Sequence, residues 1–194
     1  MINLADVPEY FEKYKKTFFE VTEFCEGLKV TYTKNKKGAI VFTIVNLKEA
    51  TTENITICSS LIEKCDMEKA FQNYPKNMII EGLIIGKGIK GNCYNKPTFR
   101  FLMHDVTTAK TKKHLTTEHR VDIFNDFLLN EGKLCHVPLI CDEIQLFSEF
   151  TPKTLLDFVK ENSLLNKNIQ QKGIACKSLK KISGKVLEFK VLNA

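Results

Sequence analysis

The feature that most constrains this chain is an apolar run that ends in a glycine-rich loop. Residues 77–85 are almost all apolar and rich in isoleucine, which is typical of a buried strand. The loop that follows, residues 86–92, has G-x-G-x-x-G spacing, in which backbone N–H groups can approach a phosphate. Residues 93–97 break the chain where a dinucleotide-binding fold needs a helix. The pattern therefore favours a tight connection between two strands.

Further elements follow from hydrophobic periodicity and turn residues. The patterns predict four helices, over residues 8–20, 59–74, 117–129 and 152–162. They predict further strands over residues 30–33, 39–47, 99–106 and 137–140, and two short strands within 172–192. The first two of these strands form a hairpin. Strands interrupted irregularly by helices indicate an α+β fold with mainly antiparallel sheets. No linker or repeat divides residues 1–194, so one domain is expected.

Composition limits the class of protein and the kind of ligand. Hydrophobic residues make up 43% and charged residues 27%, which is ordinary for a globular protein. Apolar runs are too short for a membrane span and no signal peptide is visible, so a cytoplasmic protein without membrane partners is expected. Seven cysteines without a C-x-x-C pair are read as reduced thiols. The net charge of +6 permits an anionic ligand such as a nucleotide or RNA.

Two polar positions inside apolar strands are candidate site residues. Glu81 interrupts the apolar run, and a carboxylate is costly to bury without partners. It points outward, or it lines a pocket where it accepts ribose hydroxyls or helps to hold a metal ion. His104 and Asp105 end a strand and form a candidate pair. The chain has neither an H-x-x-x-H pair nor a G-x-S-x-G elbow, so no histidine metal cluster and no serine-hydrolase site is predicted.

Several segments, in order, resemble the RNA ligase family of covalent nucleotidyltransferases, which is related to DNA ligases and mRNA capping enzymes. Residues 80–94 resemble the family's E-G-E-x-x-G-x-G-I-Q-G-N-x-Y region. Residues 101–106, 136–140, 172–177 and 189–192 resemble its F-Y-V-F-D-I, V-P, E-G-x-V-x-K and S-F-K-V-I segments. The resemblance implies one ligase-type nucleotidyltransferase domain over residues 1–194. That domain would have two mainly antiparallel sheets with flanking helices, and no appended C-terminal domain.

The departures from the family pattern bear on catalysis. The family forms a lysyl-AMP intermediate on the lysine of a K-x-D-G motif, and the matching positions here are Phe24 and Glu26. A phenyl ring has no nucleophile, so the resemblance implies a pseudoenzyme. Lys172 stands where the family has a glutamate that helps to place a metal. We therefore expect no metal site and no required cofactor. Lys29 is the candidate for a relocated nucleophile.

What remains of the pattern implies a binding site for ATP or a related nucleotide. In the family, the first-motif glycine and the carboxylate matching Glu81 contact the nucleoside, and the last two lysines face phosphates. His104 stands at the base-stacking aromatic position. The predicted nucleotide-binding residues are Phe24, Glu26, Gly27, Lys29, Glu81, His104, Lys172, Lys177 and Lys190.

Four functions follow from these observations. The first is a catalytically inactive protein that binds a nucleotide noncovalently, such as a phage decoy that sequesters a nucleotide immune signal in the host cytoplasm. The second is an RNA-binding or RNA-repair accessory protein, which requires salt-dependent RNA binding. The third is an active ligase or adenylyltransferase in which Lys29 is the nucleophile. The fourth is a scaffold for a protein partner. The oligomeric state is not predicted.

Overall fold

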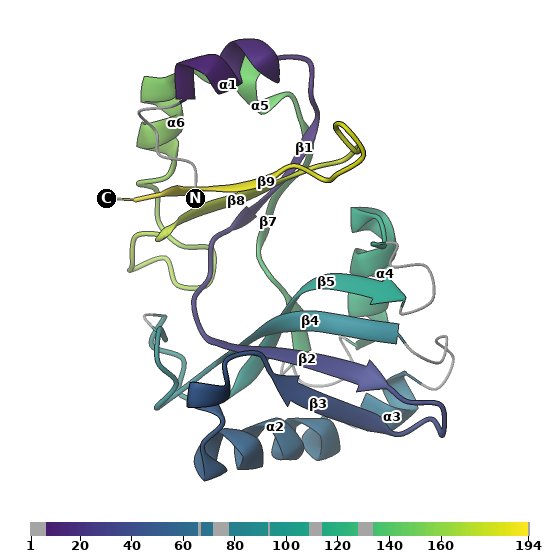
Figure 1. Cartoon of the computed structure of the whole chain (residues 1–194). Coiled ribbons are helices and arrows are strands. Elements are labelled where there is room, and N and C mark those ends of the chain that lie inside the picture. Colours follow the sequence, from purple (N-terminus) through teal and green to yellow (C-terminus); the bar gives the residue numbers. More distant parts are fainter. Residues whose placement is uncertain are drawn as a thin grey trace. The chain divides into compact units, whose positions relative to one another are not determined.

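The computed structural model describes residues 7–65, 67–71, 78–92, 94–108, 114–127 and 134–193. The chain divides into two compact units, one of residues 1–25 and 138–194 and the other of residues 26–137. Each unit is built on one β-sheet, which we call sheet A and sheet B respectively (Figure 1). In the described part of the chain, no helix is both long enough and apolar enough to cross a membrane.

Sheet A is antiparallel throughout, in the strand order β7-β1-β8-β9. Its strands are β1 (Phe19–Glu23), β7 (Leu139–Ile144), β8 (Gly173–Ser178) and β9 (Glu188–Leu192). The helices of this unit are α1 (Val7–Lys13), α5 (Leu146–Glu149) and α6 (Pro152–Phe158). Helix α6 begins as its sequence predicts, with the Thr151 side chain accepting from the Thr154 N–H in a capping box and proline at the first turn.

One face of sheet A is covered by the hydrophobic core of its unit. Phe19 and Val21 of β1 pack with Ile174 of β8 and with residues of α5 and α6. The Phe19 ring lies edge-on to Phe147 of α5, with 5.5 Å between ring centroids. Because side chains alternate along a strand, the residues between these core positions lie on the opposite face, which we call the polar face of sheet A.

Sheet B has the strand order β3-β2-β4-β5-β6, in which only β6 runs parallel to its neighbour. Its strands are β2 (Leu28–Lys34), β3 (Ile40–Ile44), β4 (Met78–Ile85), β5 (Arg100–Thr108) and β6 (Leu134–His136). The same unit contains η2 (Leu47–Glu49), α2 (Thr52–Lys64), α3 (Met67–Ala70) and α4 (Thr117–Phe127). The predicted hairpin of β2 and β3 and the predicted apolar strand β4 are present.

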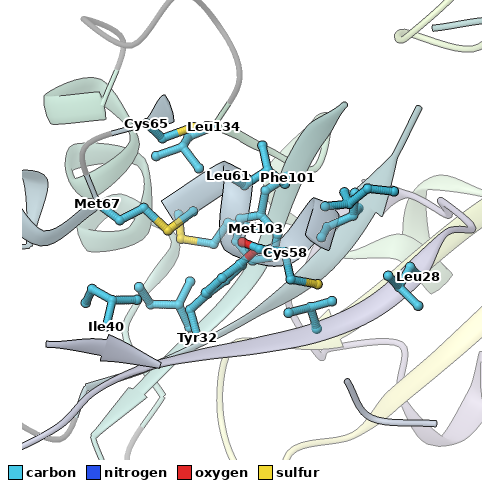
Figure 2. Packing of buried hydrophobic residues seen from close by; sticks show 14 of the residues in the cluster. Leu28, Tyr32, Ile40, Cys58, Leu61, Cys65, Met67, Phe101, Met103 and Leu134 are labelled. Carbon is cyan, nitrogen blue, oxygen red and sulfur yellow. The ribbon is translucent and has the colours of Figure 1, made fainter. Parts of the chain in front are cut away.

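The core of this unit lies between sheet B and helices α2 and α3, and Figure 2 shows its packing at close range. Tyr32 is fully buried, and its hydroxyl donates to the Cys58 carbonyl oxygen of α2 at 3.2 Å. Burial raises the pKa of Tyr32 far above its usual value and raises the pKa of the Cys58 thiol to about 11. These polar groups therefore stay neutral inside an apolar cluster.

The predicted fold class is confirmed: the structure is α+β, with two mostly antiparallel sheets and several helices. Several expected elements differ from the structure. The helix predicted over residues 152–162 ends at Phe158, and residues 72–74 and 128–129 of the helices predicted over 59–74 and 117–129 lie outside the described residues. The first helix ends at Lys13, because the chain enters sheet A at Phe19, where tertiary pairing overrides helical periodicity. Helix α2 starts at Thr52, capped by Thr51, and not at residue 59. The apolar segment 137–140 is not one strand, because residues 137 and 138 lie between β6 and β7 and only residues 139 and 140 belong to β7.

Candidate functional site

Phe24 directly follows the last residue of β1 and lies beside β8 and β9. The Phe24 N–H donates to the Gly173 carbonyl oxygen at 2.9 Å, which extends the β1–β8 pairing by one residue. The Phe24 ring is half-buried, and Lys190 Nζ lies 4.3 Å from its centroid. This is a cation–π contact, in which the negative face of the ring attracts the ammonium group. The position that resembles the nucleophilic lysine is therefore an aromatic support for a lysine of β9.

A buried carboxylate that the sequence reasoning missed fixes this end of β1. Glu23 is 1% exposed, and it accepts hydrogen bonds from the Ser163 hydroxyl at 2.5 Å and the Leu164 N–H at 2.9 Å. The Glu23 N–H donates to the Pro138 carbonyl oxygen. Both oxygens of a buried carboxylate are thus satisfied, as burial requires. A glutamate beside a candidate site residue was the only signal in the sequence, because its partner lies 140 residues away.

The other predicted lysines of this unit lie on or beside the same polar face. Lys177 of β8 lies with its Nζ 3.7 Å from Glu188 Oε1 of β9. Lys190 is one row further along the sheet, opposite Ala175 of β8. Lys172 immediately precedes β8, where its carbonyl oxygen accepts from the Asn193 N–H. The structure thus brings Phe24 and Lys190 together, with Lys177 one row away.

Gly173 explains how β8 and β9 approach each other so closely at this point. A Cβ at Gly173 would lie 2.2 Å from the Val191 carbonyl oxygen, and the residue has φ +146°. No other residue type fits without moving β9. The glycine of the family-like segment 172–177 is therefore required by strand packing in this chain.

In the second unit, Glu26 and Gly27 meet the glycine loop. A Cβ at Gly91 would lie 3.0 Å from the Glu26 Cβ and 3.3 Å from the Gly27 nitrogen. A Cβ at Gly27 would lie 2.4 Å from the Ile84 carbonyl oxygen. The loop connects β4 to β5, which pair antiparallel, so it is the tight connection that its context favours. These glycines are needed for close backbone packing within the unit.

The remaining predicted residues lie on the face of sheet B opposite its core. Glu81 of β4 is half-buried, and its register partners are Thr31 of β2 and Asp105 of β5. Lys29 of β2 is exposed and lies opposite Leu83. Nucleophilic lysines are activated by desolvation or by a neighbouring cation, and the exposed position of Lys29 supplies no burial.

Leu83 is a departure from the family-like pattern that the sequence reasoning passed over. The quoted pattern E-G-E has its second glutamate at this position, and Leu83 is 6% exposed. A buried leucine offers no oxygen to a sugar or a metal. The carboxylate of this segment is therefore Glu81 alone.

His104 and Asp105, the candidate pair, differ in their exposure to solvent. The register of β4 and β5 shifts between Glu81 and Gly82, which leaves His104 as the extra residue of a β-bulge, exposed to solvent. Asp105 is 5% exposed, and its Oδ2 lies 2.5 Å from His114 Nδ1. Its Oδ1 accepts from the Val106 N–H. One partner of Asp105 is therefore a histidine nine residues further along the chain.

Acidic and histidine side chains do not gather into a metal site. Within the described residues, no group of three or more His, Cys, Asp or Glu side chains is placed to hold a metal ion. The cysteines described are free thiols.

Comparison with solved structures gives the fold. A lysine-to-alanine variant of Naegleria gruberi RNA ligase with ATP and Mn matches 98% of this chain at 26% identity and a TM-score of 0.76. A lysine-to-methionine variant with AMP and Mn matches the same share at 25% identity and a TM-score of 0.75. The chain spans about half the length of these ligases, 54% in both cases. No protein-family model and no curated protein matches it.

The chain thus has an RNA-ligase-like nucleotidyltransferase fold. The expectation that no cofactor is required was wrong, because ligase structures of this fold hold ATP or AMP together with manganese. The expectation considered only metal ligands supplied by protein side chains, and it rested on Lys172, which stands where the family has a glutamate. Nucleotide phosphates supply metal ligands themselves.

Proposed function

We propose that this protein binds a nucleotide noncovalently and forms no covalent nucleotidyl intermediate. The observation that carries the proposal is Phe24, at the position that resembles the nucleophilic lysine, with Lys190 Nζ 4.3 Å from its ring. A phenyl ring cannot attack a phosphate, whereas the ammonium group that it supports can bind one.

The phosphate end of the ligand is assigned to the polar face of sheet A. Lys190 and Lys177 are on adjacent strands of this face, and Lys172 adds a third cation at the start of β8. The ring of Phe24 favours one position of the Lys190 side chain and so reduces the entropy lost on binding. Phosphate oxygens of the nucleotide would hold a divalent cation, which would screen the negative charge of the phosphates.

The second unit, taken by itself, carries further candidate nucleotide-binding residues. Glu81, with its carboxylate on the face of sheet B opposite the core, is the proposed acceptor for ribose hydroxyls. His104, exposed at the bulge of β5, is the proposed stacking residue for the base. Glu26, Gly27 and Lys29 complete the proposed set.

Binding without chemistry suits a protein that sequesters a nucleotide, and we include this role in the proposal. A viral decoy that withholds a nucleotide immune signal is one form of it. Sequestration requires that the ligand be recovered unchanged, which separates this role from a ligase or an adenylyltransferase with Lys29 as the nucleophile.

A second candidate function, RNA binding, is favoured by one observation. The turn between β8 and β9 carries Lys180, Lys181 and Lys185, all exposed. Lysines on a protruding hairpin suit the phosphates of a nucleic acid. RNA binding that weakens steeply with salt, in a protein that binds no mononucleotide, would establish this alternative in place of the first.

Calorimetric titration with nucleotides in the presence of Mn²⁺ tests the proposal. We expect saturable binding, weakened about tenfold in Lys190→Gln, because a charge-assisted contact to phosphate is lost. The matched control is Lys153→Gln, which removes the same charge from the exposed start of α6. Absence of binding for every nucleotide tested, or equal losses in the two variants, would reject the proposal.

A further inference from the structure

The polar face of sheet A holds an acidic row that limits how much negative charge a ligand can bring. In β8, Ile174 and Cys176 belong to the hydrophobic core, so Lys177 lies on the opposite face. Its register partners are Glu20 of β1 on one side and Glu188 of β9 on the other. Directly opposed residues of antiparallel strands point to the same face. Glu20, Lys177 and Glu188 therefore form one row across three strands.

Within this row, Lys177 has a glutamate on each side, Glu20 and Glu188. Lys177 Nζ lies 3.7 Å from Glu188 Oε1, and the two side chains are 20% and 60% exposed respectively. Glu20, on the other side, is only 5% exposed. Burial of Glu20 reduces the screening of its charge by solvent, whereas Glu188 is largely exposed. The row as a whole carries more negative than positive charge.

The next row supplies the positive charge. It consists of Thr22 of β1, Ala175 of β8 and Lys190 of β9, and only the lysine is charged. Across β1, β8 and β9, the polar face of sheet A thus holds two lysines and two glutamates, with Lys172 just outside β8 as a further cation. A ligand phosphate on Lys190 has the acidic row as its neighbour, two residues away along β9.

We infer that the site selects a nucleotide whose phosphate is a diester, with one negative charge, over a nucleoside triphosphate. The inference rests on the proposed function and names its ligand class, a cyclic mononucleotide. One lysine on an uncharged row balances a single diester charge. Each further phosphate charge on the polar face meets the carboxylates of Glu20 and Glu188 at short range, which costs affinity.

The test compares ligands that share a nucleoside and differ only in phosphate. For each of adenosine, guanosine, cytidine and uridine, the 3′,5′-cyclic monophosphate, the 5′-monophosphate and the 5′-triphosphate are titrated calorimetrically. Mn²⁺ is present throughout, so that the charge of the triphosphate is screened as far as possible. We expect the cyclic monophosphate of at least one set to bind about tenfold more tightly than the triphosphate of that set.

One variant tests the acidic row itself. In Glu188→Gln the exposed carboxylate next to Lys177 is removed, and we expect triphosphate affinity to rise about threefold with little change for the cyclic monophosphate. Glu149→Gln removes an exposed charge from α5 of the same unit and serves as the control, with both affinities unchanged. A rise of equal size in the two variants would exclude a role for the row.

The outcomes separate this inference from the proposed function. A triphosphate that binds most tightly in every set overturns the diester inference and leaves nucleotide binding in place. No binding in any set overturns both.

Discussion

Phe24 and Glu23 are adjacent in sequence and have different roles in the structure. Glu23 is buried and hydrogen-bonded to residues 163 and 164, so it holds the end of β1 in place. Phe24, one residue on, presents its ring to Lys190. A fixed backbone at Glu23 is what gives the neighbouring ring a defined position.

At Phe24, replacement by leucine keeps an apolar side chain and removes the π face. We expect Phe24→Leu to weaken nucleotide binding about threefold, because a cation–π contact at a partly exposed site is worth about 0.5–1 kcal/mol. Thermal unfolding should be little changed, since the ring is only half-buried. Calorimetry and a melting curve measure the two quantities. Affinity equal to that of the original chain would show that the ring does not organise Lys190.

At Glu23, replacement by alanine leaves the Ser163 hydroxyl and the Leu164 N–H without their acceptor in a buried place. We expect Glu23→Ala to lower the free energy of unfolding by about 2–4 kcal/mol. Chemical denaturation measures this loss. Glu143→Ala, at an exposed position of β7, is the control and should change stability by less than about 0.5 kcal/mol.

At the scale of elements, the β4–β5 loop depends on glycine for two separable reasons. Gly91 has φ +87° and a Cβ there would press on Glu26, whereas Gly38, in the β2–β3 turn, has φ +95° with open space around it. Alanine at Gly38 therefore lowers stability only because it must adopt an unfavourable left-handed backbone conformation. Alanine at Gly91 lowers stability for that reason and also because its Cβ presses on Glu26.

The two alanine variants measure this difference. We expect Gly38→Ala to lower the free energy of unfolding by about 1 kcal/mol and Gly91→Ala by about 1 kcal/mol more. Equal losses of unfolding free energy in the two variants, measured by chemical denaturation, would show that the loop moves away from Glu26 without loss of stability. In that case the loop does not hold the Glu26–Gly27 segment.

The contact between β2 and α2 predicts a pH dependence of stability. Burial raises the pKa of the Cys58 thiol to about 11, from a usual value of 9.0, and also raises that of Tyr32. The folded state holds these protons more tightly than the unfolded state, so stability is fully present below about pH 9 and falls as the pH rises toward 11. Denaturation at a series of alkaline pH values should show this fall. Its slope should be smaller in Cys58→Ala, and an unchanged slope would contradict the assignment.

Local sequence patterns predicted most of these elements but not their partners. Alternation and apolar runs located β2, β3, β4 and β5, and Thr151-Pro152 located the start of α6. The bounds of α1 and α2 were wrong, because pairing of β1 in sheet A and the cap at Thr51 decide them. The Glu23–Ser163 bond and the row of Glu20, Lys177 and Glu188 join residues distant in sequence. No local pattern contains that information.

The chain as a whole combines an RNA-ligase-like nucleotidyltransferase fold with Phe24 at the position that resembles the family's nucleophilic lysine. The similarity in fold extends over 98% of the chain, while the identity with the ligases is 25–26%. A fold does not determine an activity, which depends on particular side chains. We propose that this chain binds a nucleotide without covalent chemistry.

The most direct test of this proposal is to incubate the protein with nucleotide and Mn²⁺ and then to analyse both the protein and the nucleotide for covalent change. Intact-protein mass spectrometry and chromatography of the released ligand are applied to the same sample. We predict a protein mass without an added nucleotidyl group and a bound nucleotide recovered unchanged. A protein that gains the mass of AMP, lost again in Lys29→Ala, would contradict the proposal and establish a relocated nucleophile.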